Sequence, residues 1–471
     1  MASLIACCAT LAACGGGAPD AAPAPPAAAT VAPEATTTIS DVPWGVAPSA
    51  TLARAPETWA PLMLQAGVAA VRNFDTATTT ADHLKPLTDA GMSVSGILQW
   101  SSASPASLPV NDLAGWRRYV SDTVTRFKGR VTHWEVWNEP PNGTADKSVL
   151  SYAAVVAVAY DAAKAVDPNV QIGLAAKSNH VNWLAQAIDA GAANKFDFIT
   201  LHPYENAGLL AQGWEGQFMS IAPRVRTMLQ DKNPTKAGVP LWFSEIGLQV
   251  SPPATSGVSP EVQADALVKI YTMALAQGVA RVYWFSPRDS EGMSFGLSAT
   301  DGTPRASYAA LRSLASTLGA RPSFLGWVQP GGAHYGFVFG TAQTTVLAAW
   351  ARTGQTSTLN FASPVTVIDP RSGATRSATT LPLTDVPVLL VAPAASAQAQ
   401  QWQRDAAASV GKAFPWYGDH RNAASVSLTA GSDPQGVFMV NAPAASVVNG
   451  IAEFDLEGRS GAKFTVDPSF L

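Results

Sequence analysis

Two glutamates, Glu139 and Glu245, close short segments that have the composition of buried β-strands. Glu139 lies in a Trp-Asn-Glu-Pro segment, and Glu245 ends a Phe-Ser-Glu segment. A carboxylate without a partner is costly in such apolar surroundings, so we expect the pKa of Glu139 to be raised. Two carboxylic acids that face one cleft can divide the cleavage of a bond, because one protonates the leaving oxygen while the other attacks or activates water. Taken singly, each glutamate is equally compatible with a structural ion pair.

The segments that must position these glutamates alternate between strand and helix patterns from residue 40 to residue 320. Apolar residues recur at helical spacing between the strand-like runs, most clearly in 112–127 and 305–318. A third helix is expected to begin at Ser259, which precedes a proline and a glutamate. The expected strands are 42–46, 69–73, 93–99, 131–137, 170–174, 196–201, 240–245 and 280–285.

This alternation predicts an α/β fold, a (β/α)8 TIM barrel whose eight strand–helix units make up a domain of residues 40–320. A doubly wound open sheet is the rival fold, but no glycine-rich phosphate motif follows an early strand. Chemistry in a barrel lies where the strands end at the C-terminal face. Glu139 closes the fourth expected strand and Glu245 the seventh, so their placement favours catalysis over two unrelated ion pairs.

The pattern changes after residue 320, where helical spacing gives way to β runs. The runs 335–339, 344–350, 365–369 and 386–391 are separated by glycine, proline, asparagine and aspartate turns. This pattern predicts a C-terminal β-sandwich domain over residues 321–395. Residues 396–471 form a β-rich tail, which either belongs to the sandwich or makes a third module.

The composition excludes several classes of protein. Apolar residues make up 47% of the chain and charged residues 14%, and there are 14 tryptophans, which is typical of a large buried core. The net charge of -4 leaves no basic footprint, so we expect no nucleic-acid partner. No run of eighteen apolar residues occurs, so we expect contact with a membrane only through a lipid anchor.

The N-terminus carries all three cysteines of the chain, Cys7, Cys8 and Cys14. The later residues therefore cannot hold a disulfide framework, a cysteine zinc site or a cysteine nucleophile. Residues 1–14 resemble a lipoprotein-type signal in which Cys14 is lipidated, although no Lys or Arg precedes the apolar run, and a plain secretory signal is the alternative. Residues 15–39 form an Ala/Pro-rich tether. We expect an extracytoplasmic protein, lipid-anchored in the periplasm or at the cell surface, or secreted.

The Trp-Asn-Glu-Pro segment on the fourth expected strand and the Phe-Ser-Glu segment on the seventh resemble the catalytic motifs of clan A glycoside hydrolases. The likeness is greatest to glycoside hydrolase family 39 and its exopolysaccharide-cleaving relatives, and it covers residues 40–320 and the sandwich after them. This resemblance implies that Glu139 is the acid/base, Glu245 the nucleophile and Asn138 a partner of the sugar 2-hydroxyl. It also implies a retaining reaction, whose two carboxyl groups lie about 5–5.5 Å apart.

Other positions match the same clan strand by strand. Arg72, at the end of the second expected strand, matches an arginine that keeps Glu245 ionised, with a rim salt bridge as the alternative. His202 and Tyr204 resemble the clan's His-x-Tyr, in which the tyrosine steadies the nucleophile. Trp284, at the end of the eighth expected strand, matches the clan's aromatic sugar platform. His202 and Trp284 are also compatible with plain core positions.

The third expected strand departs from relatives that carry a histidine there, because it ends Leu-Gln-Trp. We expect its Trp100 to stack on a sugar ring instead. Glu135 alternates inward on the fourth strand and is expected to be a buried partner of a basic group. Polar side chains in the loops after the fifth and eighth strands either line a subsite or stay solvated: Lys177, Asn179, His180, Asp289 and Glu291.

Neither metal-ligand spacing nor a serine nucleophile elbow nor a phosphate loop occurs in the chain, so the sequence predicts no metal and no cofactor. We expect a monomeric retaining glycoside hydrolase that cleaves β-type bonds of a polysaccharide or oligosaccharide by double displacement. An endo-acting exopolysaccharide hydrolase is the leading interpretation. The alternatives are an exo-acting β-xylosidase or plant-polysaccharide glycosidase, and a non-catalytic carbohydrate-binding lipoprotein.

Overall fold

The computed structural model describes residues 42–72, 80–100, 107–141, 148–250, 257–328 and 333–412, together with Phe414 and short strands between 426 and 466. The expected signal (1–14) and tether (15–39) lie outside the described residues, and so does Cys14. The lipidation of Cys14 therefore stays a prediction.

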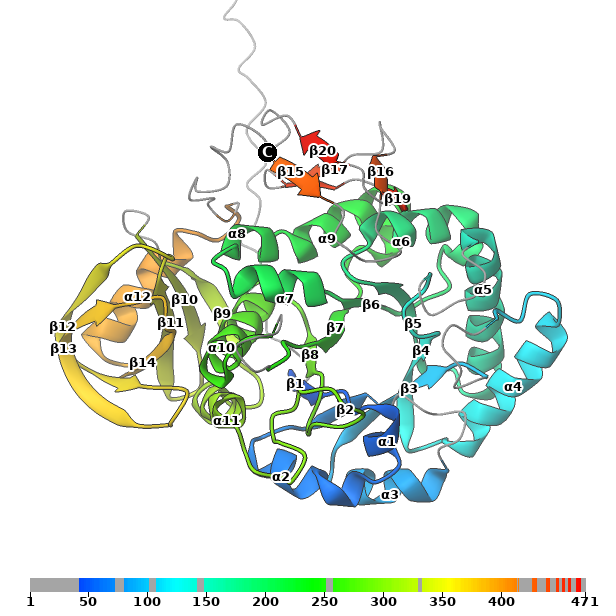
Figure 1. The fold of residues 1–471 in the computed structure, drawn as a ribbon, viewed down its shortest axis with the longest axis horizontal. Helices are drawn as coiled ribbons and strands as arrows, with labels where there is room; N and C mark the ends of the chain where they lie inside the picture. The colour runs from blue at the N-terminus through cyan, green and yellow to red at the C-terminus, as the bar shows by residue number, and fades with distance from the viewer. Residues whose placement is uncertain are drawn as a thin grey trace, which may run out of the picture.

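Eight parallel strands close into a barrel in sequence order, which confirms the expected fold class (Figure 1). Closure comes from β1, which pairs with β2 on one side and with β8 on the other. The strands are β1 (Trp44–Val46), β2 (Ala70–Arg72), β3 (Ser93–Leu98), β4 (Val131–Val136), β5 (Gln171–Lys177), β6 (Phe198–His202), β7 (Leu241–Ile246) and β8 (Arg281–Trp284). Helices ring the barrel in Figure 1: α1 (Ala50–Ala53), α2 (Ala60–Gln65), α3 (Ala81–Asp89), α4 (Leu113–Arg126), α5 (Val149–Val166), α6 (Val181–Ala187), α7 (Tyr204–Leu210), α8 (Glu215–Phe218), α9 (Ile221–Lys232), α10 (Pro260–Ala276) and α11 (Ala306–Leu318).

The helix ends follow from local sequence. The Asp112 side chain accepts a hydrogen bond of 2.7 Å from the backbone N–H of Gly115 and thereby caps α4. The hydroxyl of Ser259 caps α10 in the same way through the N–H of Val262, at 3.3 Å. Helix α11 ends at Gly319, whose φ of 74° is a left-handed conformation that favours glycine. These three helices therefore begin or end at the capping residues that the sequence offers.

Side chains of each barrel strand alternate between two buried layers. Phe198, Trp242 and Tyr283 form a separate cluster inside the barrel. Val282 and Trp284, the neighbours of Tyr283 on β8, belong instead to the large cluster that the strands share with the surrounding helices. Neighbouring residues of a strand point to opposite faces, so a shift of one residue moves a side chain from the interior of the barrel to its outer layer.

A six-stranded antiparallel sheet follows the barrel and lies on the left in Figure 1. Its order is β13-β12-β14-β11-β10-β9. The strands are β9 (Ser323–Trp327), β10 (His334–Gly340), β11 (Thr344–Ala351), β12 (Ser357–Ile368), β13 (Thr375–Leu383) and β14 (Val388–Pro393). Two edge strands, β9 and β13, were not expected from the sequence; most side chains of β13 are exposed, so its sequence lacks an apolar run.

The two faces of this sheet are covered by different partners. Phe337 and Trp350 belong to the cluster of the barrel. On the other face, Trp402 and Ala406 of helix α12 (Ala397–Ala407) pack onto Leu347 and its neighbours. The expected β-rich tail therefore begins with a helix, which Ser396 caps through the N–H of Ala399 at 3.1 Å. The rest of the tail contributes short strands that pair as β15–β20, β16–β19 and β17–β18.

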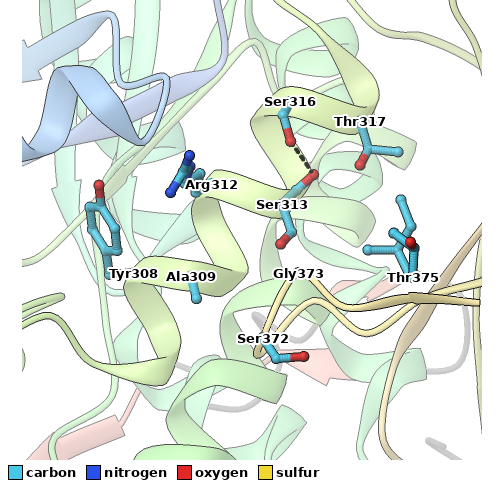
Figure 2. A pocket seen from close by; sticks show the side chains of 10 residues that line it. Tyr308, Ala309, Arg312, Ser313, Ser316, Thr317, Ser372, Gly373 and Thr375 are labelled. Atoms are coloured by element: carbon cyan, nitrogen blue, oxygen red, sulfur yellow. Dashed lines mark hydrogen bonds between the residues drawn. The ribbon is translucent and has the colours of Figure 1, made fainter.

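A buried hydrogen bond and a half-buried ion pair join the barrel to the sheet. Lys269 of α10 lies 3.2 Å from Oε1 of Glu215, and the indole N–H of Trp350 donates to the same oxygen at 3.1 Å. Beside them, Arg371 of the β12–β13 turn binds Asp265 of α10. The same turn and α11 enclose a cavity of about 430 Å³ (Figure 2).

One described helix, α5, is long and apolar enough to cross a membrane by length and composition alone. Its side chains nevertheless include Tyr152, Val155 and Val156, which are fully buried in the barrel core. Burial of this face accounts for the apolar composition of α5 as that of a packed barrel helix.

Candidate active site

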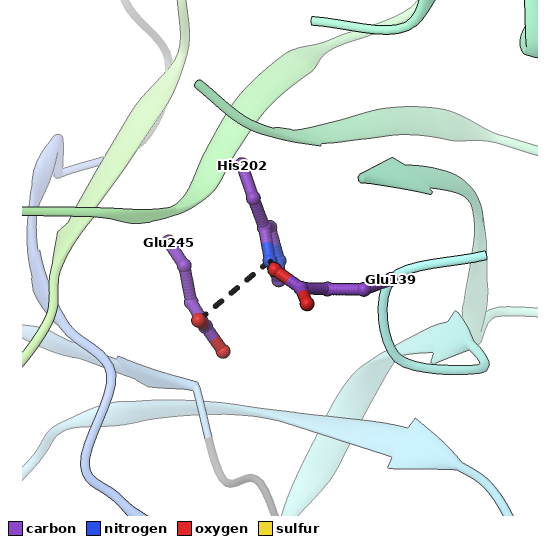
Figure 3. Close-up of side chains that lie close together, drawn as sticks. All are labelled: Glu139, His202 and Glu245. Atoms are coloured by element: carbon purple, nitrogen blue, oxygen red, sulfur yellow. Dashed lines mark hydrogen bonds and ion pairs between the residues drawn. The ribbon is translucent and has the colours of Figure 1, made fainter. Parts of the chain in front are cut away.

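The ends of four barrel strands bring the candidate residues together. Arg72 ends β2, Glu139 follows β4, His202 ends β6 and Glu245 lies near the end of β7. Figure 3 shows Glu139, His202 and Glu245 pointing toward one another from three different strands. One oxygen of each glutamate and a ring nitrogen of His202 all lie within 4.8 Å of one another. The sequence prediction that the two glutamates share one site is consistent with this geometry.

Arg72 is the central cation of the site and is 1% exposed. Its guanidinium contacts Oε2 of Glu135 at 2.6 Å, Oδ1 of Asn138 at 2.9 Å and Oε1 of Glu245. Burial alone lowers the pKa of Arg72, but the carboxylates of Glu135 and Glu245 outweigh burial and raise it. The arginine is therefore a permanent charge inside the barrel rather than a rim salt bridge, and Glu135 is its buried partner.

Arg72 also determines which way the amide of Asn138 points. A guanidinium can only donate, so the atom 2.9 Å from Arg72 must be the amide oxygen. The backbone N–H of Asn138 donates to Oε1 of Gln99 at 3.2 Å, which holds the segment after β4 against β3. Asn138 lines a cavity together with Glu139 and Glu245, and no described residue accepts a hydrogen bond from its amide N–H groups.

Glu245 has a second hydrogen-bond donor on its other oxygen. The hydroxyl of Tyr204, in the first turn of α7, donates to Oε2 of Glu245 at 3.0 Å. Burial and the charge of Glu245 raise the pKa of Tyr204 well above its usual value, so the phenol keeps its proton. Glu245 is thus held at both oxygens, by Arg72 and by Tyr204, and this arrangement agrees with the role that the resemblance implies for Tyr204.

His202 links the two glutamates to the interior of the barrel. Its Nδ1 lies 2.8 Å from Oε1 of Glu139, and its Nε2 lies 3.1 Å from the hydroxyl of Ser244. That hydroxyl donates to Glu135 at 3.3 Å, so it accepts from the N–H at Nε2. The proton at Nδ1 then decides the state of the pair, because it lies either on His202 or on Glu139.

The protonation of Glu139 differs from the sequence expectation. The apolar surroundings were expected to raise its pKa, and burial does act in that direction. The hydrogen bond and charge of His202, together with the charge of Arg72, outweigh burial and lower the pKa of Glu139. The pKa of His202 is correspondingly raised: burial lowers it, but the charges of Glu245 and Glu139 and the hydrogen bond to Glu139 prevail. The prediction of a raised pKa was wrong because it omitted the histidine from β6.

The backbone around Glu139 is held in a strained conformation. Trp137 has a φ of 68° and Glu139 a φ of 49°, both in the left-handed region. Such conformations cost about 1–3 kcal/mol each and persist where the surroundings impose them, commonly at functional sites. Trp137 is fully buried, so packing behind the segment after β4 holds Glu139 toward the cavity.

Eight described residues line the catalytic cavity, which has a volume of about 220 Å³: Ser49, Ala50, Asn138, Glu139, Glu245, Phe285, Glu291 and Met293. Trp284 is not among them. It is fully buried in the outer layer, where its N–H donates to the carbonyl of Phe295 at 3.0 Å. The expectation that Trp284 forms the sugar platform is therefore wrong, and its neighbour Phe285 presents the aromatic ring instead. Strand alternation from Tyr283, inside the barrel, would have identified Phe285.

Trp100 lies at the end of β3 and is 36% exposed. It packs edge-on against Trp116 and Tyr119 and does not line the cavity formed by the described residues. The exposed part of its ring leaves sugar stacking as a prediction for a more distant subsite.

The polar loop residues separate into two groups. Glu291 lines the cavity and accepts a hydrogen bond of 2.9 Å from the N–H of Thr51. Asp289 instead pairs with Arg305 at 2.5 Å and braces the loop after β8. The backbone N–H of Asn179 donates to Glu205 at 3.0 Å. Lys177 places a positive charge near Glu139, and His180 is the residue that precedes α6.

The donor atoms of Glu139, His202 and Glu245 are close enough to surround a metal ion, although the sequence predicts no metal. Arg72, however, already pairs with Glu245 in the same space. A fixed guanidinium charge opposes the binding of a second cation there. The donor set is better suited to proton transfer than to metal binding.

The sequence matches no protein-family model. Its structure is similar to that of a family 39 glycoside hydrolase from the gut symbiont Bacteroides cellulosilyticus WH2, with 19% identity, coverage of 75% of this chain and 81% of that chain, and a TM-score of 0.60. A GH39 beta-xylosidase from Caulobacter crescentus matches with 17% identity over 76% and 98% of the chains and a TM-score of 0.52. A GH30 endoxylanase from Clostridium papyrosolvens C71 matches with 14% identity, coverage of 75% of this chain and 97% of that chain, and a TM-score of 0.54. At these identities the comparison confirms the expected likeness in fold.

Proposed function

We propose that this protein is a retaining glycoside hydrolase in which Glu245 is the nucleophile and Glu139 the acid/base. The observation that carries the proposal is the closeness of the two carboxylates, with an oxygen of one within 4.8 Å of an oxygen of the other. Retaining glycosidases hold their carboxyl groups about 5–5.5 Å apart, whereas inverting enzymes leave about 6.5–9.5 Å for a water molecule. The fold shared with family 39 enzymes supports the same reaction.

The different neighbours of the two glutamates support the division of roles. Arg72 and Tyr204 both donate hydrogen bonds to Glu245, one to each oxygen of its carboxyl group. Glu245 is also more buried, with a side chain 9% exposed compared with 32% for Glu139. A carboxyl group held at both oxygens suits attack on the anomeric carbon, and the more accessible Glu139 suits exchange of protons with a leaving group and with water.

The reaction proceeds in two displacements. In the first, an oxygen of Glu245 forms a bond to the anomeric carbon while the bond to the leaving oxygen breaks, and Glu139 gives that oxygen its proton. In the second, water attacks the same carbon, Glu139 accepts the water proton, and the bond from the carbon to Glu245 breaks. Each displacement inverts the carbon, so the product keeps its original configuration. Asn138 donates to the 2-hydroxyl during both steps.

The proton for the first displacement comes from the pair formed by Glu139 and His202. These side chains lie 2.8 Å apart, and the lowered pKa of Glu139 beside the raised pKa of His202 favours the proton on the histidine. Binding of a sugar displaces water and places the leaving oxygen against Glu139. Transfer of the proton from Nδ1 to Glu139 and then to the leaving oxygen leaves a neutral imidazole beside an ionised carboxylate.

A saccharide-binding protein without catalysis is the competing function. Such a protein has no need for the strained backbone at Glu139 or for the hydrogen bond by which Arg72 holds Glu245. We further propose that the substrate is a bacterial exopolysaccharide cut internally, with an exo-acting β-xylosidase or plant-polysaccharide glycosidase as the second candidate. Lipidation of Cys14 would hold the enzyme outside the cytoplasm, where such polymers occur.

A reducing-sugar assay on a panel of polysaccharides tests the proposal. The wild-type protein should release reducing ends from at least one polymer, and Glu245→Gln should abolish the release while retaining binding of that polymer. Glu57→Gln, a change at an exposed glutamate that does not line the catalytic cavity, serves as the matched control and should act like the wild type. Binding without release by the wild-type protein would support the non-catalytic alternative.

A further inference from the structure

Two cavities meet along helix α11, on the side of the barrel that carries the sheet. The first, of about 430 Å³, lies between α11 and the β12–β13 turn. The second, of about 580 Å³, continues past the end of α11 to the β10–β11 turn. Ser316, Thr317 and Ile368 line both, so the two form one groove along the junction. Each volume lies in the range of ligand sites, about 300–1,000 Å³.

The lining of this junction groove is rich in hydroxyl groups. Figure 2 shows Tyr308 and Arg312 toward one end of the first cavity and Thr317 and Thr375 toward the other. The hydroxyl side chains of the groove include Ser316, Thr317, Thr341, Thr344, Ser372 and Thr375. Hydroxyl groups both donate and accept, which suits them to the hydroxyls of a saccharide.

The charge of the groove has one sign. Arg312 lines the first cavity and Arg321 the second, and no described residue that lines either cavity is acidic. Both arginines are exposed, and neither forms an ion pair with another described residue. The groove is therefore locally positive, whereas the whole chain has a net charge of -4. Their guanidinium groups can bind carboxylates with two parallel hydrogen bonds.

The groove is built before any ligand arrives. The hydroxyl of Ser313 donates to the carbonyl of Pro370 at 3.1 Å and ties α11 to the β12–β13 turn. Arg371 in the same turn binds Asp265 of α10, with 2.6 Å between Nε and Oδ1. The nearby Asp369 is occupied within the turn, because Ser372 donates to it at 2.7 Å. A preformed groove spares a ligand the entropic cost of ordering these elements.

The groove is connected to the active site through one stretch of chain. The segment after β8 contributes Glu291 and Met293 to the catalytic cavity and then continues directly into α11. Tyr308, which lies in the first turn of α11, begins the groove. The groove therefore begins in the helix into which this segment leads.

We propose that the junction groove is a second saccharide-binding site, which takes an acid-bearing stretch of a polysaccharide chain. Arg312 and Arg321 bind carboxylate groups of the polymer, and the hydroxyl side chains between them bind sugar hydroxyls. The choice of a polysaccharide rests on the proposed function, whereas the preference for acidic sugars rests on the groove itself. The groove holds the polymer near the barrel while Glu139 and Glu245 act on another part of it.

Affinity electrophoresis of the full-length Glu245→Gln protein tests this site, because the polymer then stays uncut. Gels contain polygalacturonate, alginate, neutral xylan or poly-L-glutamate, at about 0.15 M salt so that distant charges are screened. We expect retardation by at least one acidic polysaccharide. Changing both Arg312→Ala and Arg321→Ala should weaken that binding about tenfold or more, since charge-assisted hydrogen bonds are lost. Arg118→Ala, an exposed arginine on α4, is the matched control and should bind as the parent does.

Any of three results would overturn the proposal. The first is no retardation by either acidic polysaccharide, and the second is equal binding of the polysaccharide by the double variant and by the Arg118→Ala control. The third is retardation by poly-L-glutamate, which carries charge without sugars, equal to that by the acidic polysaccharides. A melting temperature of the double variant equal to that of the control shows that it is folded. Hydrolysis of an aryl glycoside by the protein with Glu245 intact reports separately on the proposed function. Acidic-polymer binding without hydrolysis would reject the hydrolase, and hydrolysis without such binding would reject the groove.

Discussion

His202 is hydrogen-bonded to Glu139, with 2.8 Å between Nδ1 of the imidazole and Oε1 of the carboxylate. This contact lowers the pKa of Glu139 and raises that of His202, against the effect of burial on each. Both shifts favour the form of the pair in which the shared proton lies on the histidine. In the proposed reaction, His202 and Glu139 act together as the acid that protonates the leaving group, because the pKa values of two coupled groups belong to the pair.

The pH dependence of activity should reveal this shared proton. In the wild-type protein, activity should fall on the alkaline side as the pair loses its proton, above the ordinary His value of 6.5. In His202→Asn, Glu139 must hold the proton alone, so the alkaline limb of the kcat/KM profile should move to lower pH. The profile is measured with an oligosaccharide or an alkyl glycoside, whose leaving oxygen must be protonated. His83→Asn, on α3, should keep the wild-type profile, and an unmoved limb in His202→Asn would exclude a shared proton.

Acid should destabilise the protein through Glu135. Its pKa lies below the ordinary 4.5: burial raises it, but Arg72 and His202 outweigh burial. Its contribution to stability is thus complete above about pH 4.5 and is lost as pH falls through the lowered folded-state pKa. Glu135→Gln leaves Arg72 short of a buried partner and should lower the unfolding free energy by about 3–5 kcal/mol at pH 7.

Thermal melts from about pH 7 to about pH 3 check this expectation. Glu139 also has a lowered pKa, so part of the acid sensitivity should remain in Glu135→Gln. The exposed substitution Glu57→Gln should leave both the melting temperature and its pH dependence unchanged. An acid dependence in Glu135→Gln as steep as in the wild type would contradict the linkage.

The junction between barrel and sheet should depend on Lys269. This lysine is 6% exposed and pairs with Glu215, which is 1% exposed. Lys269→Met removes the charge but keeps the apolar stem, so Glu215 is left as a buried charge, at a cost of about 3–5 kcal/mol in unfolding free energy. Lys232→Met removes a lysine 35% exposed that pairs with Asp189, and should cost at most about 1 kcal/mol. Chemical denaturation measures both, and equal effects would mean that the buried pair contributes no more than the exposed one.

Phe285, rather than Trp284, should provide the sugar platform. Phe285→Ala removes an aromatic surface from the cavity and should lower kcat/KM about 10- to 100-fold, since burial of a phenylalanine contributes about 1.5–3 kcal/mol. Trp284→Phe changes a core residue and should lower the melting temperature with little effect on kcat/KM. A kinetic effect confined to Trp284→Phe would restore the original assignment.

The sequence was sufficient for features that depend on local pattern. The strand that ends at Glu139 could be placed from its neighbours, and the inward position of Glu135 followed from strand alternation. Trp284 was misassigned because its position at the end of β8 was used without asking whether its side chain points into the barrel or toward the outer layer. The same alternation, counted from Tyr283, indicates Phe285.

Features that depend on several elements could not be read from one segment. The pKa of Glu139 is lowered by His202, which comes from a strand 63 residues away along the chain. The edge strand β13 has mostly exposed side chains and therefore no apolar run. The apolar face of helix α12 becomes recognisable once the helix is packed on the sheet, because Trp402 is buried there. In each case tertiary packing supplied the deciding interaction.

The central claim, that Glu245 forms the covalent bond and Glu139 transfers the proton, is tested by rescue with azide. Glu139→Ala retains the nucleophile, so with an aryl β-glycoside that needs no protonation it should still form the glycosyl-enzyme. Azide then attacks that intermediate. In Glu245→Ala, azide instead replaces the missing nucleophile in a single displacement.

The most direct measurement is the anomeric configuration of the two glycosyl azides, determined by NMR. We expect a β-azide of retained configuration from Glu139→Ala and an α-azide of inverted configuration from Glu245→Ala. The opposite pair of products would show that the roles of the two glutamates are exchanged.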